Sequence, residues 1–246
     1  MDTSIKEEYL WLLSEGEILL KGEFVLGSNY TFLIQIAHQG NLIHAVYKPT
    51  QGERPLWDFP TGTLTKREVA AFFISEALGW ELVPPTVYRQ NAPYGAGSVQ
   101  LYIEHDPEYH YFTFSQSDRE WLQPVVLFDI IVNNADRKGS HLLFDQQHHL
   151  WAIDHGICFH VEDKLRTVIW DFAGEAIPSN LTDDMIKFTH KLNGIGGESN
   201  EFRSNLEKFL HKSEIDAMLL RAEKLIDEGI FPVPSNERRQ YPWPLI

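Results

Sequence analysis

Two aspartates, Asp136 and Asp154, have the residue type and the spacing of a pair of carboxylates that act together in one site. They lie 18 positions apart in the motifs Asn-Ala-Asp-Arg (134–137) and Asp-His-Gly (154–156). Apolar runs on both sides of residues 145–148 predict a β-hairpin. Because a hairpin brings its two ends together, we expect both carboxylates to lie close together at the open end of the hairpin. Kinases use such a pair: one carboxylate orients the attacking hydroxyl, and the other, just before a glycine, holds magnesium on the ATP phosphates.

A lysine and a glutamate upstream supply two further groups of this constellation. Lys48 interrupts a short apolar strand, as expected for a lysine that grips the α- and β-phosphates. The alternative is a lysine that extends from an edge strand into solvent. Residues 65–79 predict a helix that carries an acid to meet Lys48, and Glu68 and Glu76 compete for that role. Glu68 also fits a capping box with Thr65.

Five ordered motifs between about residues 20 and 175 resemble the phosphatidylinositol 3- and 4-kinase superfamily, and above all its small bacterial phosphatidylinositol-kinase-like proteins. They are Tyr-Lys-Pro around Lys48, Arg-Glu-Val-Ala-Ala-Phe (67–72), Leu-Val-Pro-Pro-Thr (82–86), Asn-Ala-Asp-Arg (134–137) and Ile-Asp-His-Gly (153–156). The resemblance implies that Asp136 is catalytic, that Asp154 binds magnesium and that Lys48 contacts the ATP phosphates.

Two departures from the family pattern bear on activity. The family loop Asp-Arg-His-x-x-Asn is replaced by residues 136–141, so His141 stands for the metal-binding asparagine and Lys138 for the histidine. Imidazole suits manganese or zinc better than magnesium. His155 replaces the phenylalanine of the Asp-Phe-Gly triplet, whose ring packs inside. These changes support an alternative, a nucleotide-binding pseudokinase that acts as a regulatory or scaffold module.

Composition limits the class of protein. The chain has 246 residues and 43% hydrophobic content, enough for one sizeable core or two lobes. It shows no signal-peptide pattern and no apolar run near 18 residues, so membrane insertion is not expected. The single cysteine, Cys158, suits a reducing cytoplasm. A net charge of −14 argues against nucleic acid as a partner.

The amino-terminal part, residues 1–104, reads as a β-rich lobe that covers the nucleotide. Three strands are predicted, at 18–26, 30–36 and 42–47. The break at Gly27, Ser28 and Asn29 is expected to cover the phosphates, and an ordinary hairpin turn is its alternative. A further strand, 98–104, leads to Glu104, which we place in a hinge beside the adenine.

Residues 105–246 read as a mainly helical lobe, which completes an α+β, bilobal, protein-kinase-like fold. A helix begins at Ser117 or Asp118 and ends at Val132, with Asp129 as a structural hydrogen-bonding group. Further helices are expected at 182–192, 199–210 and 213–228. The proline-rich tail from residue 232 either packs extended on the surface or serves as a docking peptide; packing is the favoured interpretation.

A metal-hydrolase interpretation competes with the kinase hypothesis. His141, His155 and His160 surround the two aspartates, as ligands of a zinc or di-metal centre would. Such a centre does not explain the presence of Lys48, Glu68 and the strand-rich first hundred residues, whereas a kinase site uses all of them. We therefore favour the kinase.

The sequence thus predicts ATP-dependent phosphoryl transfer to a hydroxyl, with magnesium or manganese. Asp136 is the base or orienting carboxylate, and Arg137 and Lys138 neutralise the transferring phosphoryl group. Asp154 and His141 are the metal ligands. Residues 154–175 contain five acids and two basic residues, so we expect a protein hydroxyl or a soluble small molecule as acceptor rather than a phosphoinositide.

Overall fold

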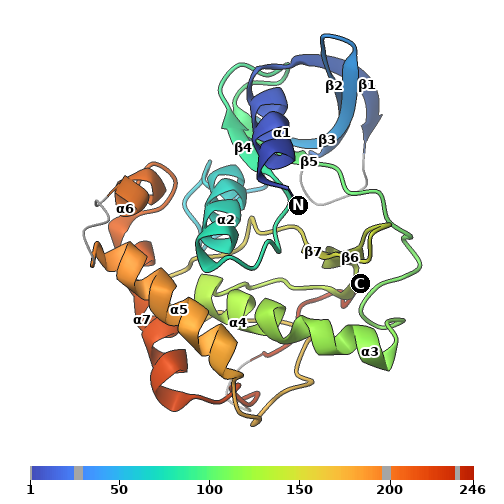
Figure 1. The fold of residues 1–246 in the computed structure, drawn as a ribbon. Helices are drawn as coiled ribbons and strands as arrows, with labels where there is room; N and C mark the ends of the chain where they lie inside the picture. The colour runs from blue at the N-terminus through green and yellow to red at the C-terminus, as the bar shows by residue number, and fades with distance from the viewer. Residues whose placement is uncertain (1, 25–29, 196–200, 236–238) are drawn as a thin grey trace.

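The computed structural model describes residues 2–24, 30–195, 201–235 and 239–246. Its amino-terminal part is a five-stranded antiparallel sheet in the order β1-β2-β3-β5-β4 (Figure 1). The strands are β1 (Glu17–Phe24), β2 (Phe32–His38), β3 (Asn41–Pro49), β4 (Thr86–Arg89) and β5 (Gly97–Leu101). Buried and half-buried side chains alternate along most of β2 and β3. One face of the sheet therefore packs in a core, and the other face carries half-buried residues such as Lys48. The three predicted amino-terminal strands are present, with residues 25–26 of the first prediction lying outside the described residues. Strand β4 was not predicted.

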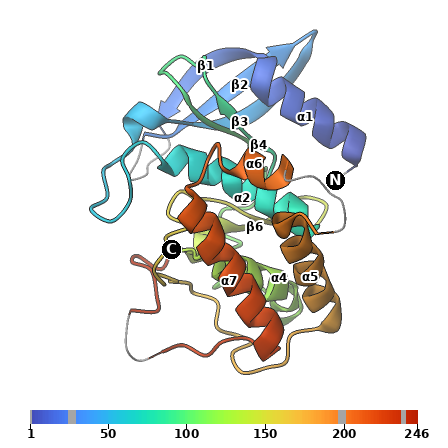
Figure 2. The same cartoon turned by 90° about the vertical axis from the view of Figure 1, so that its left-hand side faces the viewer.

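Two helices pack beside this sheet (Figure 2). Helix α1 (Thr3–Glu15) was not predicted; the Asp2 side chain caps it by accepting the Ser4 N–H at 2.9 Å, and Leu13 packs in the core of the sheet. Helix α2 (Leu64–Leu78) ends at Gly79, whose positive φ of 74° suits glycine.

The predicted capping box at α2 is wrong. The helix begins one residue earlier than expected, and the Thr65 N–H donates to Glu53 Oε1 at 2.9 Å. A residue from the preceding loop, which follows the short 3₁₀ turn Thr50–Gly52, therefore satisfies this free N–H. The side chain of Glu68 is left available for other partners.

The carboxy-terminal part is mainly helical, which confirms the predicted α+β class. Its helices are α3 (Gln116–Arg119), α4 (Gln123–Val132), α5 (Ser179–Asn193), α6 (Glu201–Leu206) and α7 (Lys212–Glu228). The predicted helix ending at Val132 is split by a 3₁₀ turn, Glu120–Leu122, because Pro124 lacks the N–H that a continuous helix needs. Its cap is Ser115 rather than Ser117 or Asp118.

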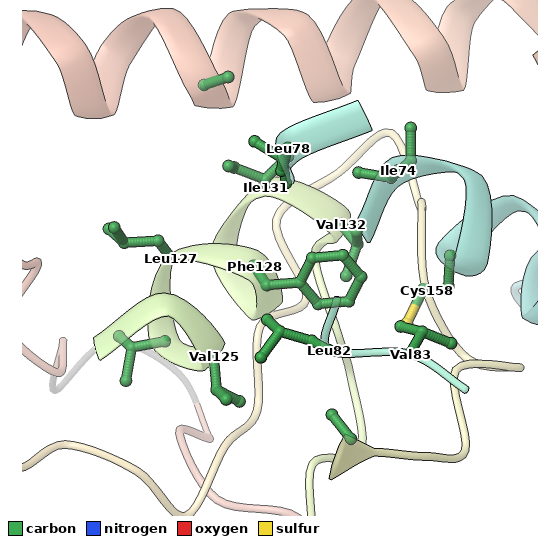
Figure 3. Close-up of a cluster of buried hydrophobic side chains, with 14 of the residues drawn as sticks. Ile74, Leu78, Leu82, Val83, Val125, Leu127, Phe128, Ile131, Val132 and Cys158 are labelled. Carbon is green, nitrogen blue, oxygen red and sulfur yellow. The ribbon is translucent and has the colours of Figure 1, made fainter. Parts of the chain in front are cut away.

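The main hydrophobic core lies around α4. Figure 3 shows Phe128 pointing toward Leu82 and Val83, with Ile74 and Leu78 of α2 on the same side of α4. Helix α2 thus belongs to the main core, whereas β3 belongs to a second apolar cluster inside the sheet. Any side-chain contact between α2 and β3 therefore joins the two clusters.

The predicted hairpin is present. Strands β6 (Leu142–Phe144) and β7 (Leu150–Ala152) pair antiparallel, with Leu143 opposite Trp151. A 3₁₀ turn, Gly139–His141, leads into β6. In the described ranges, no helix is both long and apolar enough to cross a membrane.

Candidate active site

Lys48 joins the sheet, α2 and the segment after the hairpin. Its Nζ donates to Glu68 Oε1 and, at 3.0 Å, to Asp154 Oδ1. Burial alone would lower the pKa of Lys48, but the charges of Asp154 and Glu68 outweigh it and hold the pKa above its ordinary value. The lysine therefore stays charged. Glu76, the competing candidate, pairs instead with Lys6 of α1 at 2.8 Å.

Glu68 links this lysine to the Asp-His-Gly segment. Its second oxygen, Oε2, accepts the backbone N–H of His155 at 2.8 Å. Burial raises the pKa of Glu68, and the nearby charge of Asp154 adds to the shift, while Lys48 opposes it. The carboxylate is held by partners from two sides, so it fixes the position of Lys48 relative to Asp154.

Asp154 has a left-handed backbone, with φ of 61°, which is uncommon outside glycine. The charge of Lys48 holds the pKa of its carboxyl well below the ordinary range and outweighs burial. With its side chain 47% exposed, Asp154 presents a permanent negative charge to the cavity. Strained backbone at such a carboxylate is typical of functional segments.

His141 lies directly beside Asp154, with Nε2 at 3.4 Å from Oδ2. Burial lowers the pKa of His141 to about 4, so the ring is neutral and keeps one lone pair. The Lys138 N–H points at Nδ1 from 3.4 Å, an arrangement that places the ring hydrogen on Nε2. Metal binding through Nε2 would move that hydrogen to Nδ1 and break this long contact.

Asp154 and His141 therefore fit a divalent ion as a two-residue set. In the parts of the chain that the structure describes, no group of three or more His, Cys, Asp or Glu side chains is arranged to hold a metal by itself. Nucleotide phosphates and water are the usual source of the remaining ligands when a magnesium-type ion binds at a kinase site.

Asp136 lies in the same cavity with a different electrostatic environment. Burial raises its pKa to about 6, with Asp154 adding to the shift and Lys138 opposing it. Lys138 Nζ is 3.3 Å from Asp136 Oδ2. A carboxylate with a pKa near neutrality is suited to accept a proton from a hydroxyl.

Arg137 does not occupy the position that the sequence predicted for it. Its guanidinium is 0% exposed and binds both oxygens of Asp129, with Nη2 to Oδ1 at 2.9 Å and Nε to Oδ2 at 2.9 Å. It also donates to the Ile153 carbonyl at 2.8 Å. Arg137 thus supports the loop from beneath rather than neutralising a phosphoryl group. Asp129 is the structural hydrogen-bonding residue that was predicted.

Arg166 belongs to a segment that pairs with the backbone on both sides of Asp136. The Arg166 N–H donates to the Asn134 carbonyl at 2.9 Å, and the Arg137 N–H donates to the Arg166 carbonyl at 3.0 Å. Because side chains alternate along paired extended segments, Asp136 and Arg166 face one side and Arg137 the other. Accordingly, the charge of Arg166 lowers the pKa of Asp136.

His155 keeps the buried aromatic role of the phenylalanine that it replaces. The ring is fully buried and meets Phe128 edge-on, with centroids 5.4 Å apart. Its Nε2 accepts from Arg137 Nη2 at 2.7 Å, and burial holds its pKa well below the ordinary value. The substitution therefore preserves packing and adds a hydrogen bond to the supporting arginine.

A cavity of about 270 Å³ collects most of the predicted site residues. Those that line it are Lys48, Glu68, Asp136, Lys138, His141 and Asp154, and residues not predicted include Glu53, Ser140 and Ile246. Glu104 lines a different cavity, between the chain that leaves β5 and the β6–β7 turn. Gly27, Ser28 and Asn29 lie outside the described residues.

The metal-hydrolase interpretation finds no support in this geometry. The His160 ring packs against Phe59, with centroids 5.3 Å apart, and its Nδ1 accepts the Glu162 N–H at 3.0 Å. His155 is held beneath the loop by Arg137. The three histidines that are close in sequence therefore do not converge on one point.

Comparison with known structures defines the class of the fold. The Golgi casein kinase with Mn/ADP bound matches with a TM-score of 0.58 at 14% identity, over 92% of this chain and 76% of that one. The Helicobacter pylori proinflammatory kinase CtkA matches with 0.54 at 10% identity, over 89% and 94%. Hydra Fam20 with sugar matches with 0.56 at 12% identity, over 92% and 88%. The fold is kinase-like.

The sequence comparisons then give the family. The model of the phosphatidylinositol 3- and 4-kinase family matches residues 64–224, more than half of the chain. Protein Rv2133c of Mycobacterium tuberculosis (strain ATCC 25618 / H37Rv) is 34% identical, over 98% of this chain and 96% of that protein. The chain belongs to the phosphatidylinositol 3- and 4-kinase family.

Proposed function

We propose that this protein transfers the γ-phosphoryl group of ATP to a hydroxyl acceptor. The observation that carries the proposal is the junction of Lys48 with both Glu68 and Asp154, in a cavity that Asp136 also lines. This set places a permanent cation, a permanent anion and a titratable carboxylate around one space. Phosphoryl transfer needs these charges for phosphate binding, metal binding and orientation of the hydroxyl.

Each side chain has a defined task in this proposal. Lys48 binds the α- and β-phosphates, and Glu68 holds its ammonium group in place. Asp136 accepts the hydrogen bond, and finally the proton, of the attacking hydroxyl. Lys138, beside Asp136, neutralises charge on the transferring group.

Asp154 and His141 would hold the divalent ion, which would supply positive charge to offset that of the nucleotide phosphates. The neutral state of His141 fits metal binding, because only an unprotonated imidazole nitrogen is a ligand. The Mn/ADP complex of the Golgi casein kinase supports a nucleotide and a divalent ion within this fold. Magnesium and manganese are both candidates here.

A nucleotide-binding pseudokinase is the second candidate. The observation in its favour is the His141 ring, whose contact with the Lys138 N–H must break before Nε2 can bind a metal. In a pseudokinase the cavity would bind nucleotide without turnover, and the protein would act as a regulatory or scaffold module.

Calorimetry with ATP tests the assignment. Asp154→Ala should abolish the metal-dependent part of ATP binding while the melting temperature stays near that of the wild type. Asp136→Asn is the matched variant, because it should bind ATP with metal and yet transfer no phosphate. If Asp154→Ala keeps the metal-dependent gain in ATP affinity that the wild type shows, Asp154 is not the metal ligand and the assignment is wrong.

Turnover of radiolabelled ATP over a panel of divalent ions separates the two candidates. Asp136-dependent transfer with any metal supports the kinase. Metal-dependent binding without transfer under every condition supports the pseudokinase.

A further inference from the structure

Residues 241–246 run along the loop that carries the proposed catalytic residues, and we call them the C-terminal strap. The Gly139 N–H, inside that loop, donates to the Leu245 carbonyl at 2.8 Å. Just before the strap, the Thr167 N–H donates to the Gln240 carbonyl at 3.0 Å, and within it Pro242 is buried.

Gly139 is held from two sides. Its carbonyl accepts the Tyr111 N–H at 3.3 Å, while its own N–H is bound by the strap. A Cβ at this position would come within 2.7 Å of the Phe112 ring, so the loop lies against Phe112 with no room for a side chain. The position of Gly139 sets the path of the short turn that presents Lys138, Ser140 and His141 to the cavity.

The strap also reaches the cavity itself, because Ile246 lines it together with Asp136 and Lys138. It does not plug the site: with the strap in place, the side chains of Asp136 and Asp154 are 25% and 47% exposed. A segment that binds the loop backbone and leaves the carboxylates accessible acts as a support.

We propose that the C-terminal strap is a positioning element of the phosphoryl-transfer site, which acts through the Gly139 N–H on Lys138 and His141. The inference rests on the proposed function. When the strap is bound, the loop is fixed and His141 stays beside Asp154. When the strap is released, Gly139 loses its acceptor, the loop loosens, and the two proposed metal ligands separate. A partner that captures the strap would therefore switch off the site.

Deletion of residues 245–246, with the rest of the chain unchanged, tests the proposal. We expect faster hydrogen–deuterium exchange in peptides that cover residues 137–144, and unchanged exchange in α4 and α7. Affinity for ATP with manganese should fall about tenfold, the lower end of what loss of support around metal ligands causes. Turnover should fall with it. Affinity for ATP without metal should stay the same in a variant that loosens the strap but keeps Ile246, which lines the cavity.

Trp243→Ala is the matched control, because this side chain is 77% exposed in the same strap and its loss leaves the Leu245 carbonyl in place. It should behave as the wild type. Pro242→Gly is a second variant, which removes a buried anchor of the strap without shortening the chain. It should reproduce the effects of the deletion even where the deleted protein proves unstable.

Two results would overturn the inference. One is that the deletion and Pro242→Gly both exchange residues 137–144 at the wild-type rate. The other is that both variants keep the wild-type manganese–ATP affinity and turnover. A wild-type protein that binds manganese–ATP but never turns it over contradicts the proposed kinase activity alone. The exchange and affinity measurements then still decide the role of the strap.

Discussion

Asp136 and Asp154 line one cavity but differ in the pKa of their carboxyl groups. Lys48 lowers the pKa of Asp154, so this group is ionised at every physiological pH. Burial and the negative charge of Asp154 raise the pKa of Asp136 to about 6. Two carboxylates whose environments push their pKa values apart are suited to different tasks, one as a permanent ligand and one as a proton acceptor.

The raised pKa of Asp136 predicts an acid limit to activity. Below about pH 6 the carboxyl is protonated and cannot accept the proton of a hydroxyl, so kcat/KM should fall as the pH decreases through this value. Lys138→Met removes a charge that lowers this pKa. The acid limb of the pH profile, where kcat/KM falls, should therefore move to higher pH. The measurement is kcat/KM against pH at constant manganese. Lys164→Met is the control, since Lys164 pairs with Asp58 at 2.9 Å and should leave the limb in place. An unmoved limb in Lys138→Met contradicts the assignment of Asp136.

His141 predicts a preference for manganese over magnesium. An imidazole nitrogen binds manganese better than it binds magnesium, whereas an amide oxygen suits both. His141→Asn should therefore shift the ratio of the two metal-dependent ATP affinities toward magnesium, by about tenfold if the side chain is a direct ligand. Calorimetric titrations of ATP with each metal measure the ratio. An unchanged ratio would count against His141 as a ligand.

Residue types and spacing were sufficient to predict Lys48, Asp136 and Asp154 as neighbours. They left Glu68 and Glu76 as alternatives for the partner of Lys48, and the structure pairs Lys48 with Glu68. Arg137 was misassigned because it adjoins Asp136 in sequence, yet in an extended segment the next side chain points to the opposite side. Backbone pairing between distant segments brings the charge of Arg166 within range of Asp136, and loop packing brings Glu53 to the cavity. Local patterns carry no signal for such contacts, although Arg166 was visible as one of two cations in an acidic segment.

At the scale of elements, α2 is tied to three parts of the molecule. Glu68 binds Lys48 of β3, and Arg67, one residue earlier, binds Glu214 of α7 and the Cys158 carbonyl. Lys6 of α1 binds Glu76 near the other end. These contacts fix the position of α2, and with it the position of Glu68 between the sheet and the helical part.

Arg67→Met should uncouple α2 from α7. Arg67 is fully buried, and its loss leaves Glu214 without its partner, so we expect a loss of about 3–5 kcal/mol in the free energy of unfolding. Turnover should fall as well, because the position of Glu68 depends on α2. Urea unfolding and steady-state kinetics measure the two effects. Lys66→Met, a half-exposed neighbour on the same helix, is the control and should change stability by less than about 0.5 kcal/mol. Equal stability of the two variants would contradict this role of Arg67.

The elements themselves were predictable where local signals are strong. The β6–β7 hairpin and α2 follow from apolar periodicity and turn residues, and α7 was placed within one residue of its start. Strand β4 has only four residues and follows two prolines, so its pattern is too short to predict. The start of α2 shows the limit, because the free N–H at Thr65 is satisfied by Glu53, which no local capping rule identifies.

At the scale of the whole molecule, the proposed site lies where two apolar clusters meet. One cluster fills the sheet and the other surrounds α4, and the ion pair between Lys48 and Glu68 joins an element of each. The α+β architecture was predictable, since most strand-like patterns lie before residue 105 and most helix-like patterns lie after it. The path of the strap was not, because its contacts are backbone hydrogen bonds that any sequence can form.

The charge of the whole molecule favours an acceptor other than a phosphoinositide. A protein with a net charge of −14 is repelled by an anionic lipid surface unless a basic face compensates. Of the two cations in residues 154–175, Lys164 is paired with Asp58, while Glu162 nearby has a side chain that is 78% exposed. A phosphorylated headgroup would need several convergent Arg or Lys donors.

We therefore predict phosphorylation of a protein hydroxyl or a soluble small molecule. Incubation with ATP and manganese should add phosphate to Ser or Thr of the protein itself, detected as an increase in intact mass. Vesicles containing phosphatidylinositol should remain unlabelled under the same conditions. Asp136→Asn is the control and should show no increase in mass. Robust, Asp136-dependent labelling of phosphatidylinositol without labelling of protein would show that the acceptor is the lipid and that this prediction is wrong.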